Sequence, residues 1–239
     1  MRILILGDSG MLGHMVKRYL NFNTDYEIHT IKEARFPSPD FKNLILNDYD
    51  YIINCIGSIP QRTKDYTLNY ELPIWLEQNI NTRIIHPGTD CEADNDEYGI
   101  SKKRARDFIV DEGTHTKIIK TSIIGPELNG NYSLMDWFLS QEDEVGGYTN
   151  VMWNGNTTLE WAKNCLNLIN NWNEYPVESI LEGTCVSKFD LLHYISEVFE
   201  KQITINPNGA VVADKCLKGH IKTPHIKDQL KELKLYYGN

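Results

Sequence analysis

The first fourteen residues constrain the fold of this chain more than any other segment. The apolar run Ile3–Leu6 leads directly into the turn Gly7–Gly13, and an amphipathic stretch, Met15–Leu20, follows it. This order predicts a buried strand, a tight turn and a helix. Glycine lets the backbone approach a ligand, and the N–H groups of a helix N-terminus attract negative charge. The turn, which has the spacing G-x-x-G-x-x-G, therefore predicts a pyrophosphate-binding site for a dinucleotide, although such a turn can also be purely structural.

Composition and charge narrow the class of protein. The 239 residues carry a net charge of −9, which argues against a broad nucleic-acid surface. The N-terminal apolar run is too short for a signal peptide, and no run is long enough to span a membrane, so we expect a cytoplasmic protein without membrane contact. The five cysteines are scattered and lack C-x-x-C spacing, so we expect neither a disulfide framework nor a metal site.

Strand-like and helix-like segments alternate through the first half of the chain. Apolar, non-alternating strands separated by helices are typical of a parallel sheet that is covered on both faces. We therefore predict an α/β fold with a Rossmann-type, doubly wound parallel sheet. The strands are expected at 3–6, 26–31, 51–57, 83–86 and 117–121, and the helices at 41–46, 68–78 and 98–110.

After residue 125 the pattern loosens. Helices are predicted at 133–140, 159–169, 188–199 and 226–235, with a strand at 178–182. We expect residues 1–125 to form a dinucleotide-binding domain together with part of 145–182. Residues 126–144 and 183–239 are expected to form a small substrate-binding lobe at the carboxyl ends of the strands.

A tyrosine and a lysine lie four residues apart in the predicted helix after the strand 83–86. Tyr98 and Lys102 therefore share one helix face, and a nearby ammonium lowers the pKa of a phenol, which suits it to proton transfer. Thr89 follows the preceding strand and places a hydroxyl at the same edge of the sheet, although a threonine there can simply cap a helix or form a turn. We predict Tyr98, Lys102 and Thr89 as catalytic residues, and we expect Ser101 to be an exposed helix residue.

With Gly7, Gly10, Gly13, Thr89, Tyr98 and Lys102 in these places, the chain resembles the extended short-chain dehydrogenases/reductases, and within them the dTDP-4-dehydrorhamnose reductase-like sugar-nucleotide enzymes. Supporting segments are Asn54–Gly57, Asn69–Pro73, Lys120–Gly125 and Trp153–Leu159. The resemblance implies that Tyr98 donates a proton to a sugar keto oxygen, that Thr89 hydrogen-bonds the same oxygen, and that Lys102 binds the nicotinamide ribose. Hydride would come from the dihydronicotinamide.

The resemblance also implies two sets of binding residues. The cofactor set is Gly7, Ser9, Gly10, Met11, Leu12, Gly13, Lys32, Arg35, Cys55, Ile56, Gly57, Asn69 and Lys102. The substrate set is Thr121, Ser122, Trp153 and Asn154, although tryptophans are more often simply part of a core. Lys32 and Arg35 flank Glu33 after the second strand, so two cations against one anion favour NADP(H) over NAD(H). The alternative is that all three are solvated loop charges.

Three functions stay open at the level of sequence. The first is NAD(P)H-dependent reduction of a keto group on a nucleotide-linked deoxysugar, in a polysaccharide pathway. The second is a cofactor-binding regulatory or scaffold subunit without turnover, which is suggested by the short segment of eight residues between Thr89 and Tyr98. The third is a sugar-nucleotide epimerase or dehydratase that retains NAD. The helices at 66–80 and 97–112 are candidates for a homodimer interface, although their apolar positions can equally face their own sheet.

Overall fold

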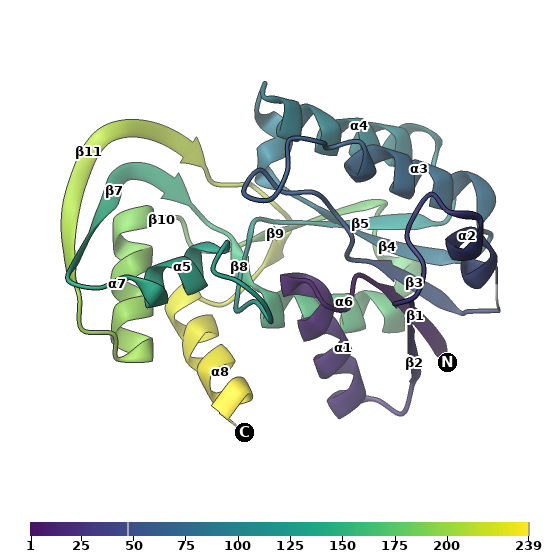
Figure 1. Ribbon diagram of the computed structural model, residues 1–239, viewed down its shortest axis with the longest axis horizontal. Helices are drawn as coiled ribbons and strands as arrows, with labels where there is room; N and C mark the ends of the chain where they lie inside the picture. The colour runs from purple at the N-terminus through teal and green to yellow at the C-terminus, as the bar shows by residue number, and fades with distance from the viewer. Residues whose placement is uncertain (47, 239) are drawn as a thin grey trace.

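Seven parallel strands form the main sheet of the protein (Figure 1), which we describe from a computed structural model of residues 1–46 and 48–238. All six pairings between neighbouring strands in this large sheet are parallel. In spatial order its strands are β12 (Ile221–Lys222), β9 (Glu178–Glu182), β5 (Thr116–Lys120), β4 (Arg83–Gly88), β3 (Tyr51–Asn54), β1 (Arg2–Leu6) and β2 (Glu27–Thr30). The sheet confirms the predicted Rossmann-type, doubly wound fold class.

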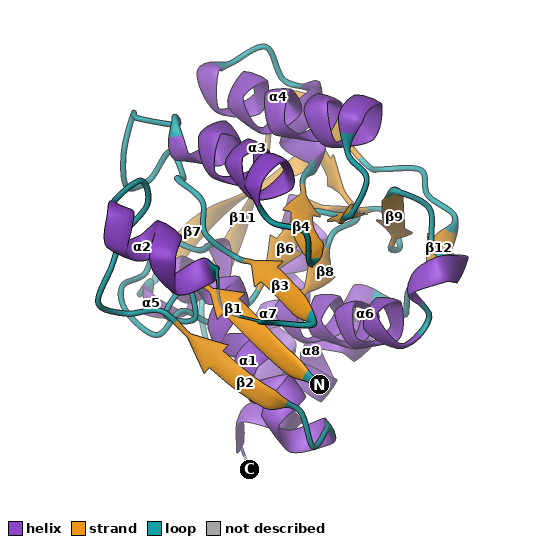
Figure 2. Ribbon diagram, turned by 90° about the vertical axis from the view of Figure 1, so that its right-hand side faces the viewer, coloured by secondary structure: helices purple, strands orange, loops and turns teal. Residues whose placement is uncertain are grey.

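Helices cover both faces of the large sheet (Figure 2). Helices α1 (Met11–Asn23) and α6 (Thr158–Asn170) pack together on one face. The other face carries α2 (Pro39–Ile45), α3 (Leu68–Asn79) and α4 (Glu97–Glu112). Within the described residues, no helix is both long enough and apolar enough to cross a membrane.

The alternation of side chains along β1 explains why both faces are needed. Ile3 and Ile5 belong to the hydrophobic core on the α1 and α6 side. Leu4 and Leu6 belong to a second core on the α2 and α3 side. Because successive residues of a strand point to opposite faces, an unbroken apolar run is buried only when helices lie on both sides.

A smaller sheet packs beside the large one and is drawn at the left of Figure 1. Its strands are β10 (Val186–Ser187), β7 (Glu144–Trp153) and β11 (Thr204–Lys215), in that order. Strand β7 pairs with β11 in parallel and with β10 antiparallel. The helices of this region are α5 (Leu134–Ser140), α7 (Lys188–Phe199) and α8 (Ile226–Gly238), and α7 packs against both β7 and α8. A short parallel pair, β6 (Ile123–Ile124) and β8 (Asn156–Thr157), completes the strands.

The predicted helices and strands of the first 125 residues are confirmed to within a few residues, as are the four later helices and the strand at 178–182. The small sheet was not predicted. The expectation that no cysteines are paired is wrong, because Cys185 and Cys216 form a disulfide. These two residues lie 31 positions apart in sequence, and only the fold brings their loops together.

Candidate active site

The predicted site residues follow the carboxyl ends of four neighbouring strands. Gly7 follows β1, Cys55 follows β3, Thr89 follows β4 and Thr121 follows β5. Strand β1 lies between β2 and β3. Strand β2 therefore lies on one side of β1, and all later strands of the large sheet lie on its other side. Ligands of doubly wound sheets bind outside the strand ends at such a reversal. The topology therefore places the glycine turn at the expected binding edge.

Two glycines of the turn are required by its geometry. Gly7 has φ +82°, a left-handed conformation, and a Cβ atom there would lie 3.0 Å from the Cys55 carbonyl. A Cβ atom on Gly13 would lie only 2.1 Å from the Gly7 carbonyl oxygen, so helix α1 can pack against the turn only without a side chain at this position. Ser9 is exposed, Met11 is half-buried and Leu12 is buried.

The start of helix α1 has the properties of an anion site. Its N-cap is Gly10, which supplies no side-chain hydrogen bond, and its first turn contains no acidic residue. The Gly10 N–H donates to the Gly7 carbonyl at 3.0 Å, which closes the turn. The nearby carboxylate of Asp8 is paired with Lys17 at 2.7 Å. The free amides at the start of the helix therefore fit the phosphates of a dinucleotide.

The other predicted cofactor residues fall into two groups. Cys55 and Ile56 are half-buried and Gly57 is exposed in the loop that touches the glycine turn. Lys32 and Arg35 are exposed after β2, and neither side chain pairs with a carboxylate among the described residues. Free cations at this position suit an additional phosphate on the cofactor ribose.

The Asn69 side chain holds the loop after β3 against helix α4. Asn69 is buried, and its Oδ1 accepts a hydrogen bond from the Ser58 N–H at 2.7 Å. Its Nδ2 donates to the Ser58 carbonyl and to Ser101 Oγ, at 3.1 Å each. These bonds join the loop after β3 to helix α4. The prediction that Ser101 is exposed is wrong, because its hydroxyl lies inside this helix contact and donates to the Tyr98 carbonyl at 2.6 Å.

Tyr98 lies in the first turn of α4, where Asp96 caps the helix by accepting from the Gly99 N–H at 2.7 Å. Its ring packs edge-on against Tyr66, with centroids 5.7 Å apart. Its hydroxyl makes no hydrogen bond with any described residue. Burial raises the pKa of Tyr98 well above its ordinary value, and the neighbouring Cys91 and Asp90 raise it further. The expected lowering of the phenol pKa by Lys102 is therefore absent from this arrangement, and the phenol is held as a proton donor.

Lys102 is buried on the same face of α4. Its ammonium donates to the Pro87 carbonyl at 3.3 Å. Burial lowers its pKa, an effect that Glu92 opposes. His86, on β4, is kept neutral, because burial and then the charge of Lys102 lower its pKa. The Nδ1 atom of His86 lies 3.2 Å from Nδ2 of Asn54.

Thr89 caps the short 3₁₀ helix Asp90–Ala93, which makes up half of the segment between β4 and α4. Its hydroxyl accepts from the Cys91 N–H at 3.3 Å and donates to Asp90 Oδ1 at 3.0 Å. Its N–H donates to Glu92 Oε1 at 2.9 Å, which completes a capping box. Thr89 therefore acts as an N-cap, which is the alternative role that the sequence suggests. To donate to a substrate oxygen, its hydroxyl would have to give up the hydrogen bond to Asp90.

The predicted substrate residues lie where the two sheets meet. Thr121 is buried, and its Oγ1 accepts a hydrogen bond from Asn156 Nδ2 at 2.8 Å. Ser122 is half-buried, and its carbonyl accepts a hydrogen bond from the Asn156 N–H. Trp153 is buried at the end of β7, and a Cβ atom on Gly155 would lie 2.2 Å from its ring. The glycine therefore lets the chain turn tightly beside the indole.

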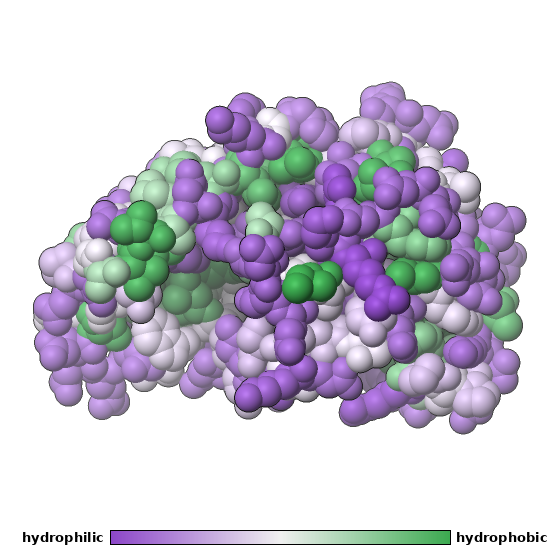
Figure 3. Space-filling model, turned by 90° about the horizontal axis from the view of Figure 1, so that it is seen from above, coloured by the Kyte–Doolittle hydropathy of each residue, from purple (hydrophilic) through white to green (hydrophobic). Residues whose placement is uncertain are grey.

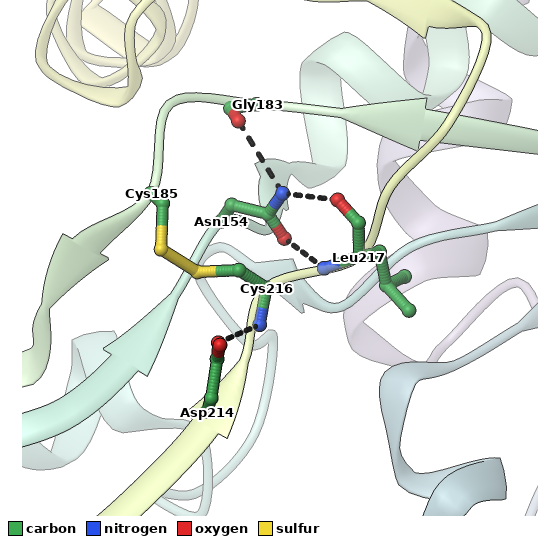
Figure 4. The surroundings of a disulfide bond; sticks show 6 residues. All are labelled: Asn154, Gly183, Cys185, Asp214, Cys216 and Leu217. Atoms are coloured by element: carbon green, nitrogen blue, oxygen red, sulfur yellow. Dashed lines mark hydrogen bonds between the residues drawn. A yellow bond between two sulfur atoms is a disulfide. The ribbon is translucent and has the colours of Figure 1, made fainter.

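Asn154 joins two loops next to the disulfide (Figure 4). Its Nδ2 donates to the Gly183 carbonyl at 3.3 Å and to the Leu217 carbonyl at 2.7 Å, and its Oδ1 accepts from the Leu217 N–H at 2.8 Å. The Cys185–Cys216 bond links the same two loops. A cavity of about 520 Å³ lies here, lined by Asn154, Glu182–Cys185, Asp214, Cys216–Lys218, Lys222 and Thr223. Both polar atoms of the Asn154 side chain are thus engaged with the backbone.

Two lysines at the meeting of the sheets, Lys215 and Lys188, were not predicted from the sequence. Lys215, at the end of β11, forms an ion pair with Asp94, which joins the small sheet to the segment before α4. Lys188 begins helix α7 and lies over the Trp153 ring, 4.4 Å from its centroid. No local sequence signal identifies them, because each acquires its neighbours from a segment more than thirty residues away.

The face formed by α3 and α4 is mostly hydrophilic, with separate hydrophobic areas set among polar residues (Figure 3). Ile100 on α4 is one of its exposed apolar side chains. The two helices pack against each other, and their buried residues face their own sheet. A homodimer through this face stays a prediction.

No protein-family model and no curated protein matches the chain. Solved structures do match over its whole length. A dTDP-4-dehydrorhamnose reductase from Clostridium acetobutylicum is 19% identical, covers 100% of both chains and superposes with a TM-score of 0.77. The chain shares the fold of this enzyme.

Two further structures extend the comparison. A dTDP-4-dehydrorhamnose reductase from Bacillus anthracis in complex with NADP is 14% identical, with 98% of both chains covered and a TM-score of 0.79. A dTDP-glucose 4,6-dehydratase from the same organism in complex with NAD is 13% identical, covers 100% of this chain and 96% of the other, and has a TM-score of 0.73. The fold therefore occurs in sugar-nucleotide enzymes with either dinucleotide.

Proposed function

We propose that the protein is an NAD(P)H-dependent reductase of a keto group on a nucleotide-linked sugar. The observation that carries the proposal is the placement of Tyr98 and Lys102 on one helix face at the same sheet edge as the Gly7–Gly13 turn. In this proposal the part of the chain around the large sheet binds the dinucleotide. The part around the small sheet binds the sugar nucleotide. The full-length match to reductase structures supports the same assignment.

The side chains have separate tasks in this reaction. A bound reduced nicotinamide would supply the hydride. Tyr98 donates its proton to the keto oxygen as negative charge develops there, and its raised pKa keeps it protonated until then. Lys102, on the same face of α4, holds the nicotinamide ribose through its ammonium. Thr89 supplies a second donor to the same oxygen if its hydroxyl turns away from Asp90.

NADP(H) is the favoured cofactor in this proposal. Lys32 and Arg35 are exposed and unpaired after β2, at the position where a 2′-phosphate would be recognised. The glycine turn and the uncapped start of α1 suit the pyrophosphate of either dinucleotide. The double variant Lys32→Ser and Arg35→Ser is expected to bind NADPH more weakly and to bind NADH with unchanged affinity.

The central experiment follows NADPH oxidation with dTDP- and UDP-linked 4-keto sugars, using the wild-type protein and Tyr98→Phe. We expect kcat to fall by about 10²–10⁴-fold in the variant, the usual contribution of a general acid. The Kd for NADPH should not change, because the variant keeps the ring and its packing on Tyr66. Equal rates in the two proteins would exclude the mechanism.

The pH profile gives a second readout of the same residue. Because the pKa of Tyr98 lies above its ordinary value of 10.0, the phenol remains protonated as pH rises from 7 to 9. The proton-donor form is therefore not lost in this range, and we expect the part of kcat that depends on Tyr98 to stay level. A fall in kcat with an apparent pKa near 7 that disappears in Tyr98→Phe would contradict this account.

A cofactor-binding subunit without turnover is the second candidate. It is favoured by one observation, that the Thr89 hydroxyl is already engaged by Asp90 and by the Cys91 N–H. In that case the protein binds NADPH tightly but consumes none of the keto sugars. The same assay therefore separates the two candidates.

A further inference from the structure

Lys188 occupies an unusual position at the meeting of the two sheets. It is the first residue of α7, directly after the N-cap Ser187, and α7 packs against β7. Its ammonium lies 4.4 Å from the centroid of the Trp153 ring. Trp153 is itself buried and is confined by the backbone at Gly155. The indole therefore provides a fixed platform for the charge, of the kind that attracts a cation through its ring face.

Among the described residues, no carboxylate lies within ion-pair distance of Lys188, although Asp90 acts on its charge from farther away. Within the described residues, Lys188 makes neither an ion pair nor a hydrogen bond. Two other lysines at this seam are paired, Lys120 with Glu92 at 2.6 Å and Lys215 with Asp94. A cation that is largely surrounded by protein and lacks a partner is costly, so such groups commonly serve a ligand.

The titratable groups that face Lys188 belong to the segment after β4. Burial lowers the pKa of Lys188 to about 8, an effect that Asp90 and Cys91 oppose. Asp90 already accepts from the Thr89 hydroxyl at 3.0 Å. Burial raises the pKa of Cys91 to about 12, so its thiol is neutral. Lys188 is consequently cationic at pH 7 and loses its charge as pH rises through about 8.

Lys188 and Tyr98 lie on different sides of the same short segment, which contains Asp90 and Cys91. Asp90 and Cys91 act on the pKa of both side chains. Tyr98 comes from the large-sheet side through α4, and Lys188 comes from the small-sheet side through α7. A substrate whose keto carbon lies at Tyr98 and which extends toward the small sheet would therefore pass the ammonium.

We propose that Lys188, held over the Trp153 ring, binds the diphosphate group of the nucleotide-linked substrate. The inference rests on the proposed function, because it assumes that the sugar lies at Tyr98. A lysine ammonium is a compact charge that binds phosphate oxygens, and the diphosphate supplies the direct ion pair that Lys188 lacks among the described residues. Lys188 thus selects substrates in which an anionic linker follows the sugar.

The experiment measures binding of dTDP, UDP and GDP by calorimetry to the wild-type protein, Lys188→Met and Lys188→Arg. Loss of a charge-assisted hydrogen bond is expected to weaken the best of these ligands by about 10- to 100-fold in Lys188→Met. Lys188→Arg should retain most of the affinity. NADPH binding should be unchanged in both variants. Lys227→Met is the matched control, because Lys227 of α8 also lies over a ring, that of Tyr194, but is paired with Glu197 of α7.

The pH dependence tests the same charge. Affinity of the wild-type protein for the nucleoside diphosphate should fall between pH 7 and 9 as Lys188 loses its proton. Lys188→Arg, which stays charged, should show a smaller fall. An unchanged Kd in Lys188→Met overturns the proposal, as does an equal loss of NADPH affinity or failure of the wild-type protein to bind any of the three ligands.

The proposed function and this inference fail in different ways. Lys188-dependent binding of a nucleoside diphosphate without any reduction of keto sugars supports the site and rejects the reductase. Reduction of a keto sugar with the same KM in Lys188→Met supports the reductase and rejects the site.

Discussion

At the scale of single residues, the glycine turn shows how one motif combines a steric and an electrostatic requirement. Gly7 is needed for its left-handed φ, whereas Gly13 is needed because helix α1 touches the Gly7 carbonyl. The turn was predictable from sequence, since both requirements act over a few neighbouring residues.

Replacement of Gly13 by Ala is expected to lower the free energy of unfolding by roughly 1–3 kcal/mol, because the new Cβ atom forces α1 away from the turn. NADPH affinity should fall with it, since the first amides of α1 move. Urea denaturation and cofactor titration measure the two effects. Gly146→Ala is the control, because a Cβ atom there meets nothing within 4 Å and should change stability by less than about 0.5 kcal/mol. Equal stability of the two variants would refute this reading of the turn.

The residues of the site were predictable to different degrees. Tyr98 and Lys102 were recognised because their spacing alone places them on one helix face. The pKa of Tyr98 was predicted in the wrong direction, since its burial and the nearby Asp90 depend on the folded segment after β4. Lys188 was missed because its relation to Trp153 arises only when α7 packs on β7.

At the scale of elements, the strands of the large sheet were predictable and those of the small sheet were not. Strand β1 is an unbroken apolar run, whereas β7 begins with Glu144 and contains Gly146 and Gly147, and only two of its residues in ten are apolar and buried. Strand β11 is mostly exposed and contains Pro207. Such strands are specified by their pairing partners, which here lie about sixty residues away in the chain.

The disulfide is expected to stabilise the loops beside Asn154. Closing a loop of 31 residues removes entropy from the unfolded chain and contributes about 3–4 kcal/mol in the chain-entropy account. Reduction, or Cys185→Ser, should therefore lower Tm by roughly 10 °C in calorimetry. A reductant should have no further effect on Cys185→Ser, and an unchanged Tm of the reduced wild-type protein would refute the role. Thiol trapping in cells would also test the predicted cytoplasmic location, where such bonds are rare.

At the scale of the whole molecule, the chain crosses repeatedly between its two sheets. Strands β7, β10 and β11 belong to the small sheet, whereas β9, which lies between β7 and β10 in sequence, and β12, which follows β11, belong to the large one. One hydrophobic core joins Met15 of α1 to Trp161 of α6 and Leu230 of α8. The predicted first unit, residues 1–125 with part of 145–182, therefore shares this core with Leu230 of the last helix, and the division into two parts stays a prediction.

A fragment of residues 1–125 is expected to be unable to fold by itself. Without α6 one face of the sheet loses its cover, and without β9 the outer edge of β5 is left unpaired. Circular dichroism and amide exchange of the isolated fragment should show an unfolded or aggregated chain, whereas addition of residues 126–239 should restore structure. A fragment that is folded and monomeric on its own would contradict the shared core.

The return of β12 to the edge of the large sheet also sets an order of events during synthesis. The ribosome delivers β9 some forty residues before the strand that protects its open side. A nascent chain must wait with that backbone exposed until Ile221 and Lys222 emerge. Chaperones that shield unpaired backbone edges are therefore most useful to this protein in the interval between synthesis of β9 and synthesis of β12.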